Sequence, residues 1–531
     1  MISRRSFTTL LGATILGGGL SAAGPARAAT TARDTLNFLL GSDPGILTGI
    51  RAANAGIYYI GPKINEGLVQ YDFDQNPQPL LAESWEIAPD ARSFAFHLRK
   101  GVKWHDGAPF TAKDVAFSIR TLRETHPRGG VVFKSLTDVE TPDEHTAVLQ
   151  LSDPVPYLMD FLHASETPIL PAHRYENAGD PLENPANNAP VGTGPFVFRE
   201  WVPGSHVILE RNPDYWDSTK PILNRIVYRF VGDTAARSVA LETGEVDIGV
   251  ETPIAPSEVQ RLRALPTIQI ESASYEAAPF YVRLEFRLDN EFLSKLKVRQ
   301  AIAHAINQQA ILDIAYLGNG SLATGPLPPT AKRFYESDVT THPFDPARAE
   351  VLLDEAGFPR ATDGTRFTLR LRGYPEGADH RAAAEMIKQQ LIAVGIGIDH
   401  VVSDTAEWIR TVYTDRAFDL SFSSVSVNHD PAIGVQRLFW SKNIRPGVAF
   451  SNVTGYANPE VDRLLEGAAV EPDLEKRREL YSQFQKIVTE ELPEVPLVAL
   501  KKFTLANAKL KDFVVSGDGA KGDLGAAWFE A

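Results

Sequence analysis

The fold is decided by three neighbouring segments, LAESW (residues 81–85), FAFHLRKGVKWHDG (94–107) and PFTAKDV (109–115). Apolar and polar residues alternate over 93–98, as they do in a half-buried strand, and Asp106-Gly107 supplies a turn. Thr111 is a good helix N-cap with Asp114 three residues later, and an apolar stripe follows over 115–122. The stretch therefore predicts a hairpin and a helix within one folding unit.

Helix and strand signals alternate through the rest of the chain. Asp345-Pro346 forms the start of a helix that Gly357 closes, and a helical pattern at 382–394 precedes a strand-like run at 396–402. The remaining elements are helices at 298–315, from Asn458-Pro459 onward and at 474–490, and strands at 418–427 and 495–506. The segments 176–195 and 318–329, rich in Pro, Gly and Asn, are plausible boundaries. These patterns predict an α/β protein of several units.

Composition excludes several classes of protein. The chain has 531 residues, of which 43% are hydrophobic and 23% charged, as in globular proteins that bury a large core. The formal charge of -14 opposes general affinity for nucleic acid or anionic lipid. Because there is no cysteine, disulfides, thiolate nucleophiles and lipidation on cysteine are excluded.

The first 28 residues are typical of a twin-arginine export signal. Arg4-Arg5 precedes an apolar, glycine-interrupted stretch at 10–20, and Ala26-Arg27-Ala28 supplies small residues for cleavage. The apolar stretch is shorter than the roughly 20 residues of a membrane span. We therefore expect a soluble periplasmic protein, exported and not a lipoprotein.

Common catalytic motifs are absent from the sequence. None of the 12 histidines has another four residues away, so there is no HExxH zinc site, and no serine lies in G-x-S-x-G. Gly192-Thr193-Gly194 is followed by Pro195 where a phosphate-binding loop needs a helix. His105-Asp106 lies in the expected hairpin turn, which favours a structural role. We expect no enzyme activity, no cofactor and no metal site.

The three opening segments resemble the signature of family 5 extracellular solute-binding proteins, the peptide- and nickel-binding receptors of ABC importers. Further matches lie along the mature chain, at 192–196, 212–216, 244–247, 298–302, 355–359 and 458–462. The resemblance implies a two-lobed periplasmic-binding-protein fold of class II, the large peptide-binding type, with an extra subdomain inserted in the first lobe. The implied boundaries are 29–57, 189–274 and 494–531 for the first lobe, 58–188 for the inserted subdomain and 275–493 for the second lobe.

The resemblance also implies a function and partners. Such a receptor closes as a hinged clamp over a peptide-like or similar small solute and delivers it to a membrane permease. ATP is hydrolysed by another subunit, which agrees with the missing phosphate loop. We expect a monomer that binds no nucleic acid. The competing hypothesis is an exported glycan hydrolase that uses paired carboxylates. A third alternative is a receptor that signals to a membrane sensor.

The ligand residues implied by the resemblance lie in the second lobe. Peptide-binding relatives pair the ligand amino group with an Asp that precedes a proline after a strand, and Asn428-His429-Asp430-Pro431 follows the expected strand 418–427. Asp430 also suits a helix N-cap, so capping alone is the alternative. The loop 373–379 contains no Arg to hold a carboxylate, unlike dipeptide-binding relatives. With Glu376 beside Asp430, it favours an amine-bearing ligand.

Aromatic residues complete the predicted site. Tyr374, Trp408 and Trp440 are candidates for walls of the cleft, since solute pockets combine flat apolar faces with few polar contacts. Trp408 follows the helix start Asp404-Thr405, which favours packing in the core as the alternative. His429 is a candidate ligand-binding residue, with direct metal ligation or a solvent-facing position as the alternatives. The sequence leaves the identity of the ligand open.

Overall fold

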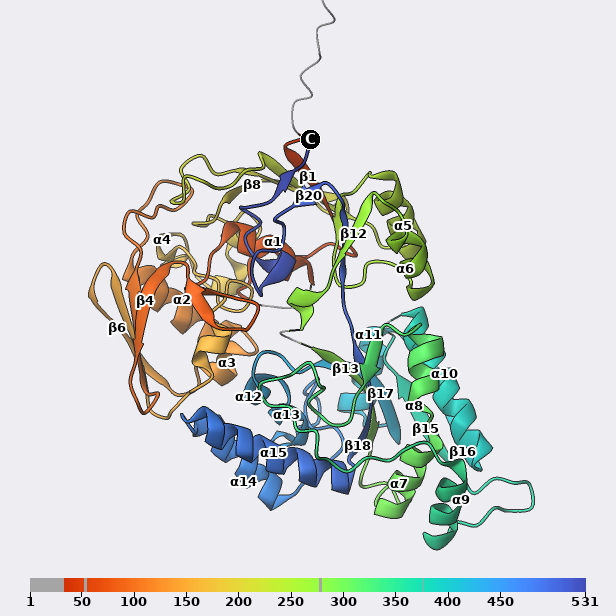
Figure 1. The fold of residues 1–531 in the computed structure, drawn as a ribbon. Coiled ribbons are helices and arrows are strands. Elements are labelled where there is room, and N and C mark those ends of the chain that lie inside the picture. The colour runs from red at the N-terminus through yellow and green to blue at the C-terminus, as the bar shows by residue number, and fades with distance from the viewer. Residues whose placement is uncertain (1–32, 52–54, 277–278, 376) are drawn as a thin grey trace, which may run out of the picture.

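The computed structural model describes residues 33–51, 55–276, 279–375 and 377–531, so the predicted leader lies outside the described residues. Figure 1 shows an upper lobe, a lower lobe and a subdomain beside the upper one. We call these the first lobe, the second lobe and the inserted subdomain. In the described part of the chain, no helix has the length and apolar character needed to cross a bilayer.

The first lobe is built on a seven-stranded sheet of order β12-β19-β11-β1-β10-β9-β8. Central strand β1 runs parallel to β10 and β11, and its Leu36, Phe38, Leu39 and Leu40 are buried. The strands are β1 (Thr35–Leu40), β8 (Phe196–Val202), β9 (His206–Arg211), β10 (Arg225–Phe230), β11 (Ile248–Gly249), β12 (Ile268–Glu271) and β19 (Thr504–Asn507). The helices are α1 (Ala55–Ile64), α5 (Thr234–Thr243) and α6 (Pro256–Arg263), and β20 (Leu510–Lys511) pairs with β21 (Trp528–Phe529).

The inserted subdomain contains a four-stranded antiparallel sheet of order β4-β5-β7-β6. Its elements are β4 (Ala82–Ile87), β5 (Ser93–Leu98), α2 (Ala112–Thr125), α3 (Gly129–Val132), β6 (Leu136–Asp143), β7 (Thr146–Leu151) and α4 (Ala172–Tyr175). A small hairpin, β2 (Val69–Tyr71) with β3 (Pro77–Pro79), lies beside it. Thr111 and Asp114 form the predicted capping box, and the predicted strand at 93–98 is confirmed.

The second lobe has a six-stranded mixed sheet of order β14-β18-β13-β17-β15-β16. Its strands are β13 (Phe280–Phe286), β14 (Gly320–Leu322), β15 (Phe367–Gly373), β16 (Ile396–Val402), β17 (Leu420–Ser426) and β18 (Glu494–Leu500). Its helices are α7 (Leu296–Ala305), α8 (Gln308–Ala310), α9 (Pro346–Glu355), α10 (Ala378–Ala393), α11 (Thr405–Ile409), α12 (Pro431–Gly434), α13 (Gln436–Phe439), α14 (Pro459–Val470) and α15 (Leu474–Glu491). The predicted helix starts at Asp345-Pro346 and Asn458-Pro459 are confirmed by side-chain caps.

The structure differs from the sequence prediction in two places. The helix predicted over 298–315 is interrupted after Ala305, because the side chain of Asn307 caps a new turn by accepting a hydrogen bond from Ala310 N. The strand-like run 495–506 divides between the two sheets, since β18 pairs with β13 and β14 whereas β19 pairs with β11 and β12.

The predicted domain boundaries need two corrections. Strand β18, assigned above to the first lobe, belongs to the second, and the blue segment in Figure 1 crosses to the upper lobe only after it. Residues 58–64, assigned above to the inserted subdomain, belong to helix α1, whose Tyr59, Ile60 and Ile64 pack into the first lobe's core. Backbone pairing and apolar packing therefore move both boundaries.

Candidate functional site

A cavity of about 400 Å³ lies between the two lobes. Residues of the first lobe and inserted subdomain form its first wall: Tyr58, Arg128, Asp160, Phe161, His163, Ser165, Glu166, Glu251 and Lys521. Residues of the second lobe form its second wall: Phe280, Tyr374, Ser426, Asn428, His429 and Ile433. Lys502, on the crossover between β18 and β19, completes the lining. Because both lobes contribute, any occupant of this interlobe cavity contacts both.

The first wall carries a fixed ion pair beside a tyrosine. Arg128, which precedes α3, donates from Nε to Glu166 Oε2 at 2.8 Å and from Nη2 to the hydroxyl oxygen of Tyr58 at 2.6 Å. Burial raises the pKa of Tyr58 to about 12, and the nearby carboxylate of Glu166 adds to this effect. Arg128 is therefore already engaged by groups of the protein.

The hinge end of the cavity contains two lysines and one glutamate. The Lys502 ammonium lies 3.5 Å from the centroid of the Phe280 ring and 3.9 Å from Glu251 Oε2. Glu251 also accepts a hydrogen bond from Tyr59 OH at 3.2 Å. The Lys521 ammonium lies 5.6 Å from the ring centroid of Tyr58. This end of the cavity combines cations with aromatic faces.

The second wall is formed where strands β15 and β17 end. Tyr374 follows β15, and Asn428 and His429 follow β17. Asn428 has φ +54, a left-handed conformation that Asn tolerates better than most residues, and this turns the chain toward the cavity. The His429 ring stacks on Tyr71 at a centroid distance of 5.9 Å and meets the edge of His163 at 5.1 Å. The two histidines thus bring the lobes into contact.

Burial keeps both of these histidines neutral. It lowers the pKa of His429 to about 4, helped by the positive charge of Lys521, and it lowers the pKa of His163 well below its ordinary value. His429 Nδ1 and His163 Nε2 are buried and have no hydrogen-bond partner among the described residues. Protonation of either ring is therefore unfavourable while the lobes are in contact.

An ion pair also joins the lobes at the outer end of the cavity. Arg333 Nη1 of the second lobe lies 2.9 Å from Asp160 Oδ1 of the inserted subdomain. Burial raises the pKa of Asp160, and Arg333 opposes that effect. Beyond this pair lies a second hollow of about 560 Å³, also lined by Asp160, Asn428 and His429. The structure is that of a closed clamp.

Three of the predicted site residues line the cavity: Tyr374, Asn428 and His429. Asp430 is fully buried and does not line it. Its carboxylate accepts hydrogen bonds from Arg477 Nη2 at 2.8 and 2.9 Å and from Ala432 N at 2.9 Å, so it caps α12 and is paired inside the second lobe. This geometry does not support the prediction that Asp430 pairs with an amino group of the ligand, because its charge is already balanced.

The predicted tryptophans lie outside the cavity lining. Trp408 is 1% exposed, packs edge-on against Tyr374 at 4.8 Å and donates from Nε1 to Arg372 O, so it supports the wall from behind. Trp440 is half-buried, and its Nε1 donates to Glu466 Oε1 of helix α14 at 2.7 Å. Glu376 lies outside the described residues.

Sequence reasoning missed the charged residues of the first wall and the crossover. Arg128, Lys502 and Lys521 lie in no recognisable motif and come from distant parts of the chain. Only the family-level expectation that the cleft lies between lobes pointed toward them. His105, in contrast, has the structural role predicted, since its Nε2 contacts Gly194 O at 2.9 Å and its Nδ1 accepts from Gly192 N.

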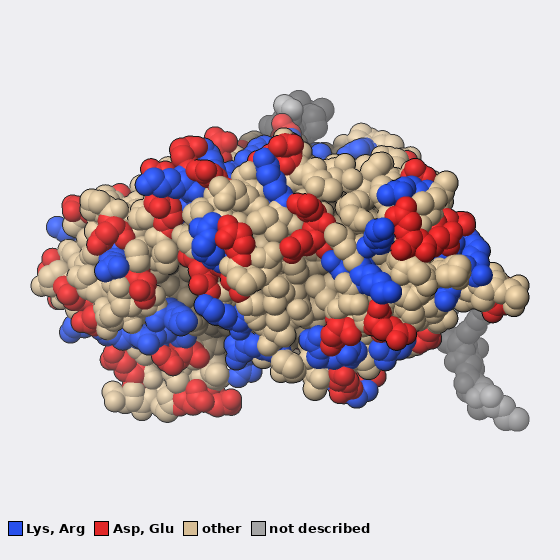
Figure 2. Space-filling model, turned by 90° about the horizontal axis from the view of Figure 1, so that it is seen from below, with Lys and Arg blue, Asp and Glu red and all other residues tan. Residues whose placement is uncertain are grey.

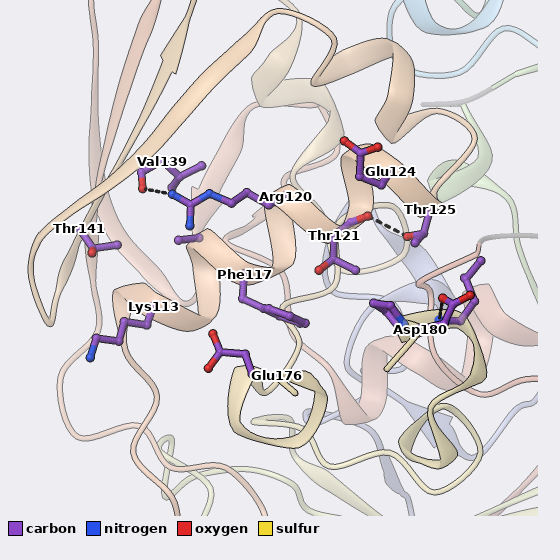
Figure 3. Close-up of a pocket in the computed structure, with 13 residues that line it drawn as sticks. Lys113, Phe117, Arg120, Thr121, Glu124, Thr125, Val139, Thr141, Glu176 and Asp180 are labelled. Atoms are coloured by element: carbon purple, nitrogen blue, oxygen red, sulfur yellow. Dashed lines mark hydrogen bonds between the residues drawn. The ribbon is translucent and has the colours of Figure 1, made fainter. Parts of the chain in front are cut away.

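A larger hollow of about 700 Å³ lies on the inserted subdomain, between α2 and the loop containing Glu176 and Asp180. Figure 3 shows Arg120 turned toward Val139, whose carbonyl accepts its hydrogen bond at 2.9 Å. Its lining comes from one subdomain alone, so closure of the lobes would not enclose an occupant. We therefore take the interlobe cavity as the candidate site.

On the face seen from below, charged groups form no patch of one sign, and the described residues contain no cluster of metal-ligating groups. Figure 2 shows Lys and Arg interspersed with Asp and Glu over the face seen from below. Within the described ranges, no three His, Asp or Glu side chains are grouped so that they could hold a metal ion.

Known proteins resemble this chain in sequence and in fold. The family model of bacterial extracellular solute-binding proteins, family 5 middle, matches residues 76–447. A Brucella ovis protein, provisionally named an ABC transporter peptide-binding protein, is 31% identical over 522 residues, which cover 95% of this chain and 94% of that protein. Heme-binding protein A of Haemophilus influenzae is 30% identical over 462 residues, which cover 83% and 82%.

A solved structure supports the same assignment. The binding protein AgaA from A. tumefaciens R10, in complex with agropinic acid, is 27% identical with a TM-score of 0.76, and the match covers 94% of this chain and 99% of that one. Sequence and fold agree over most of both chains. This chain belongs to family 5 of the bacterial extracellular solute-binding proteins.

Proposed function

We propose that this protein captures a small solute in the interlobe cavity and presents it, chemically unchanged, to the permease of an ABC importer. The observation that carries the proposal is the lining of the cavity, which comes from both lobes. The relatives named above are solute-binding proteins, and none of them supports the alternative of a glycan hydrolase.

Closure depends on contacts that exist only while the lobes meet. The Asp160–Arg333 ion pair and the His163–His429 ring contact both join the inserted subdomain to the second lobe. A solute stabilises the closed state only to the extent that it binds that state better than the open one. We propose Tyr374, Asn428 and His429 as second-wall contacts of the solute.

The proposed location in the cell is supported by the sequence of residues 1–28 and by the family. We propose export through the twin-arginine signal at residues 1–28 and a monomeric, soluble life in the periplasm. The closed form is the one that the permease recognises. The relatives are named for different cargoes, a peptide, heme and agropinic acid, so the family does not by itself give the solute.

Small-angle scattering combined with mass spectrometry tests this function. The mature chain, freed of bound solute by unfolding and refolding, is measured before and after addition of concentrated extract from its own periplasm. We expect the radius of gyration to fall, and the bound molecule to be recovered with its mass unchanged. A constant radius with every extract, or recovery of cleaved products, would contradict the proposal.

A further inference from the structure

The carboxylates around the interlobe cavity already have partners within the protein. Glu166 is held by Arg128 at 2.8 Å, and Asp160 by Arg333 at 2.9 Å. Asp430, behind the second wall, is held by Arg477 at 2.8 Å. At these three carboxylates, a solute ammonium group would have to displace a guanidinium, which leaves a buried or half-buried charge unpaired. Glu251, the remaining carboxylate of the described lining, accepts a hydrogen bond from Tyr59 OH and has Lys502 at 3.9 Å.

The charges of the two cavity lysines are less fully paired with carboxylates than those of the arginines. Among the described residues, Lys521 has no carboxylate within 4 Å of its ammonium group, which lies 5.6 Å from the ring centroid of Tyr58 and 6.0 Å from that of Tyr59. Asp518, on the same turn, accepts instead from Tyr71 N at 3.1 Å. Lys502 reaches Glu251 only at 3.9 Å. In the described lining, the hinge end of the cavity therefore carries two lysines against one glutamate, Glu251, which leaves one positive charge in excess.

The positive side chains of the cavity also affect the pKa values of the two buried histidines. The pKa of His163 is lowered mainly by burial, and the charged neighbours that lower it further include Lys521 and Arg128. The pKa of His429 is lowered by burial and then by Lys521, with Glu166 acting in the opposite direction and Arg333 and Arg128 adding to the decrease. Lys521 and Arg128 thus both oppose a positive charge on either ring.

The described part of the second wall adds neutral groups only. Its described residues are Phe280, Tyr374, Ser426, Asn428, His429 and Ile433. They offer aromatic faces and hydrogen-bonding groups, but no carboxylate that would hold an amine. The charge preference of the cavity is therefore set at its hinge end.

We infer that the cavity selects a solute with a carboxylate or comparable acidic group, held between Lys521 and Lys502, and that it does not require an amino group on the solute. The inference rests on the proposed function and narrows its substrate class. It differs from the amine-bearing ligand expected from the sequence, which relied on Glu376 beside a free Asp430. Asp430 is paired with Arg477, and Glu376 lies outside the described residues.

Selective chemical blocking of a periplasmic extract tests the inference. One portion is treated with acetic anhydride to block amines, one is methyl-esterified to block carboxylates, and one is left untreated. The solute-free mature chain is mixed with each and examined by native mass spectrometry. We expect the adduct to persist after amine blocking and to fall at least tenfold after esterification.

Two contrary outcomes are distinguishable. Loss of the adduct after amine blocking, with survival after esterification, would overturn the acidic-solute inference but leave solute capture intact. Absence of any adduct with the untreated extract would overturn the proposed function as well.

Binding measurements on lysine variants test whether the acidic group of the solute lies beside Lys521. With the extract fraction retained by an anion exchanger as the probe, Lys521→Gln is expected to weaken binding at least tenfold, whereas Lys521→Arg keeps the charge and stays within threefold of the wild type. Lys501→Gln, an exposed lysine outside the lining, is the matched control and should bind as the wild type does. Unchanged binding by a folded Lys521→Gln variant would overturn the assignment.

Discussion

The two walls of the interlobe cavity differ in charge. The first wall and the crossover contribute every charged side chain in the described lining, namely Arg128, Asp160, Glu166, Glu251, Lys521 and Lys502. The described residues of the second wall present aromatic and neutral polar groups, and Asp430, which follows His429, is turned inward to Arg477. The difference indicates that one wall selects the charge of the solute and the other closes over its uncharged surface.

The largest expected effect tests whether Asp430 belongs to the interior of the second lobe. Arg477→Ala leaves a buried carboxylate without its partner, so the free energy of unfolding should fall by about 3–5 kcal/mol. Arg463→Ala, which removes an exposed pair with Glu460 on the neighbouring helix α14, should change it by less than about 1 kcal/mol. Chemical denaturation measures both. Similar losses in the two variants would place Asp430 at the surface.

The next effect is a dependence of the free energy of unfolding on pH, which arises from the neutral His429 of the second wall. Burial lowers the pKa of His429 to about 4, whereas an unfolded histidine titrates near 6.5, so the unfolded chain binds more protons between these values. Stability from this group is complete above about pH 6.5 and is lost as pH falls toward 4, by about 2 kcal/mol at pH 5.

Two variants isolate this contribution. His429→Gln should reduce the loss of unfolding free energy between pH 7 and pH 5, and His97→Gln, on the exposed side of β5, should leave it unchanged. The groups that act on His429 are His163, Tyr71, Lys521, Glu166, Arg333 and Arg128. An identical pH profile for His429→Gln and the wild type would show that the ring is accessible to water.

A smaller effect tests the contact between the walls. Arg333→Gln removes the ion pair with Asp160, and we expect the closed state to lose about 1–2 kcal/mol because the carboxylate is buried. The radius of gyration without solute should increase. Lys332→Gln, which breaks an exposed pair with Glu276, is the control. Equal scattering curves for the two variants would mean that Arg333 does not hold the lobes together.

The smallest expected effect lies within the second wall. Tyr374→Leu removes an aromatic face that lines the cavity, so affinity for the periplasmic probe should fall by about two- to fivefold with no change in its preference for acidic solutes. Trp440→Phe, which alters an aromatic group outside the cavity, should leave affinity unchanged. A change of charge preference in Tyr374→Leu would contradict the division of roles between the walls.

Local signals in the sequence were sufficient for many elements. The capping box at Thr111 and Asp114, the Asp345-Pro346 helix start and the strand at 396–402 all depend on residues close together in the chain, and all three are confirmed. Each signal arises from a hydrogen bond or an alternation that a few neighbouring residues determine.

Long-range pairing explains what the sequence could not predict. Strands β18 and β19 both fall within the strand-like run 495–506, yet they enter different sheets, and only their hydrogen-bonded partners decide this. Asp430 and Arg477 are 47 positions apart, so the ion pair that takes Asp430 away from the cavity has no local signature. Lys521 reaches the cavity only because the C-terminal segment folds back on α1.

A crystal structure of the mature protein with the solute retained from its own periplasm tests the central claim most directly. The account predicts one intact molecule between the two walls, with an acidic group within hydrogen-bonding distance of Lys521 Nζ and with Asp430 still bound to Arg477. A solute amine bound to Asp430, or a solute located outside the interlobe cavity, would contradict it.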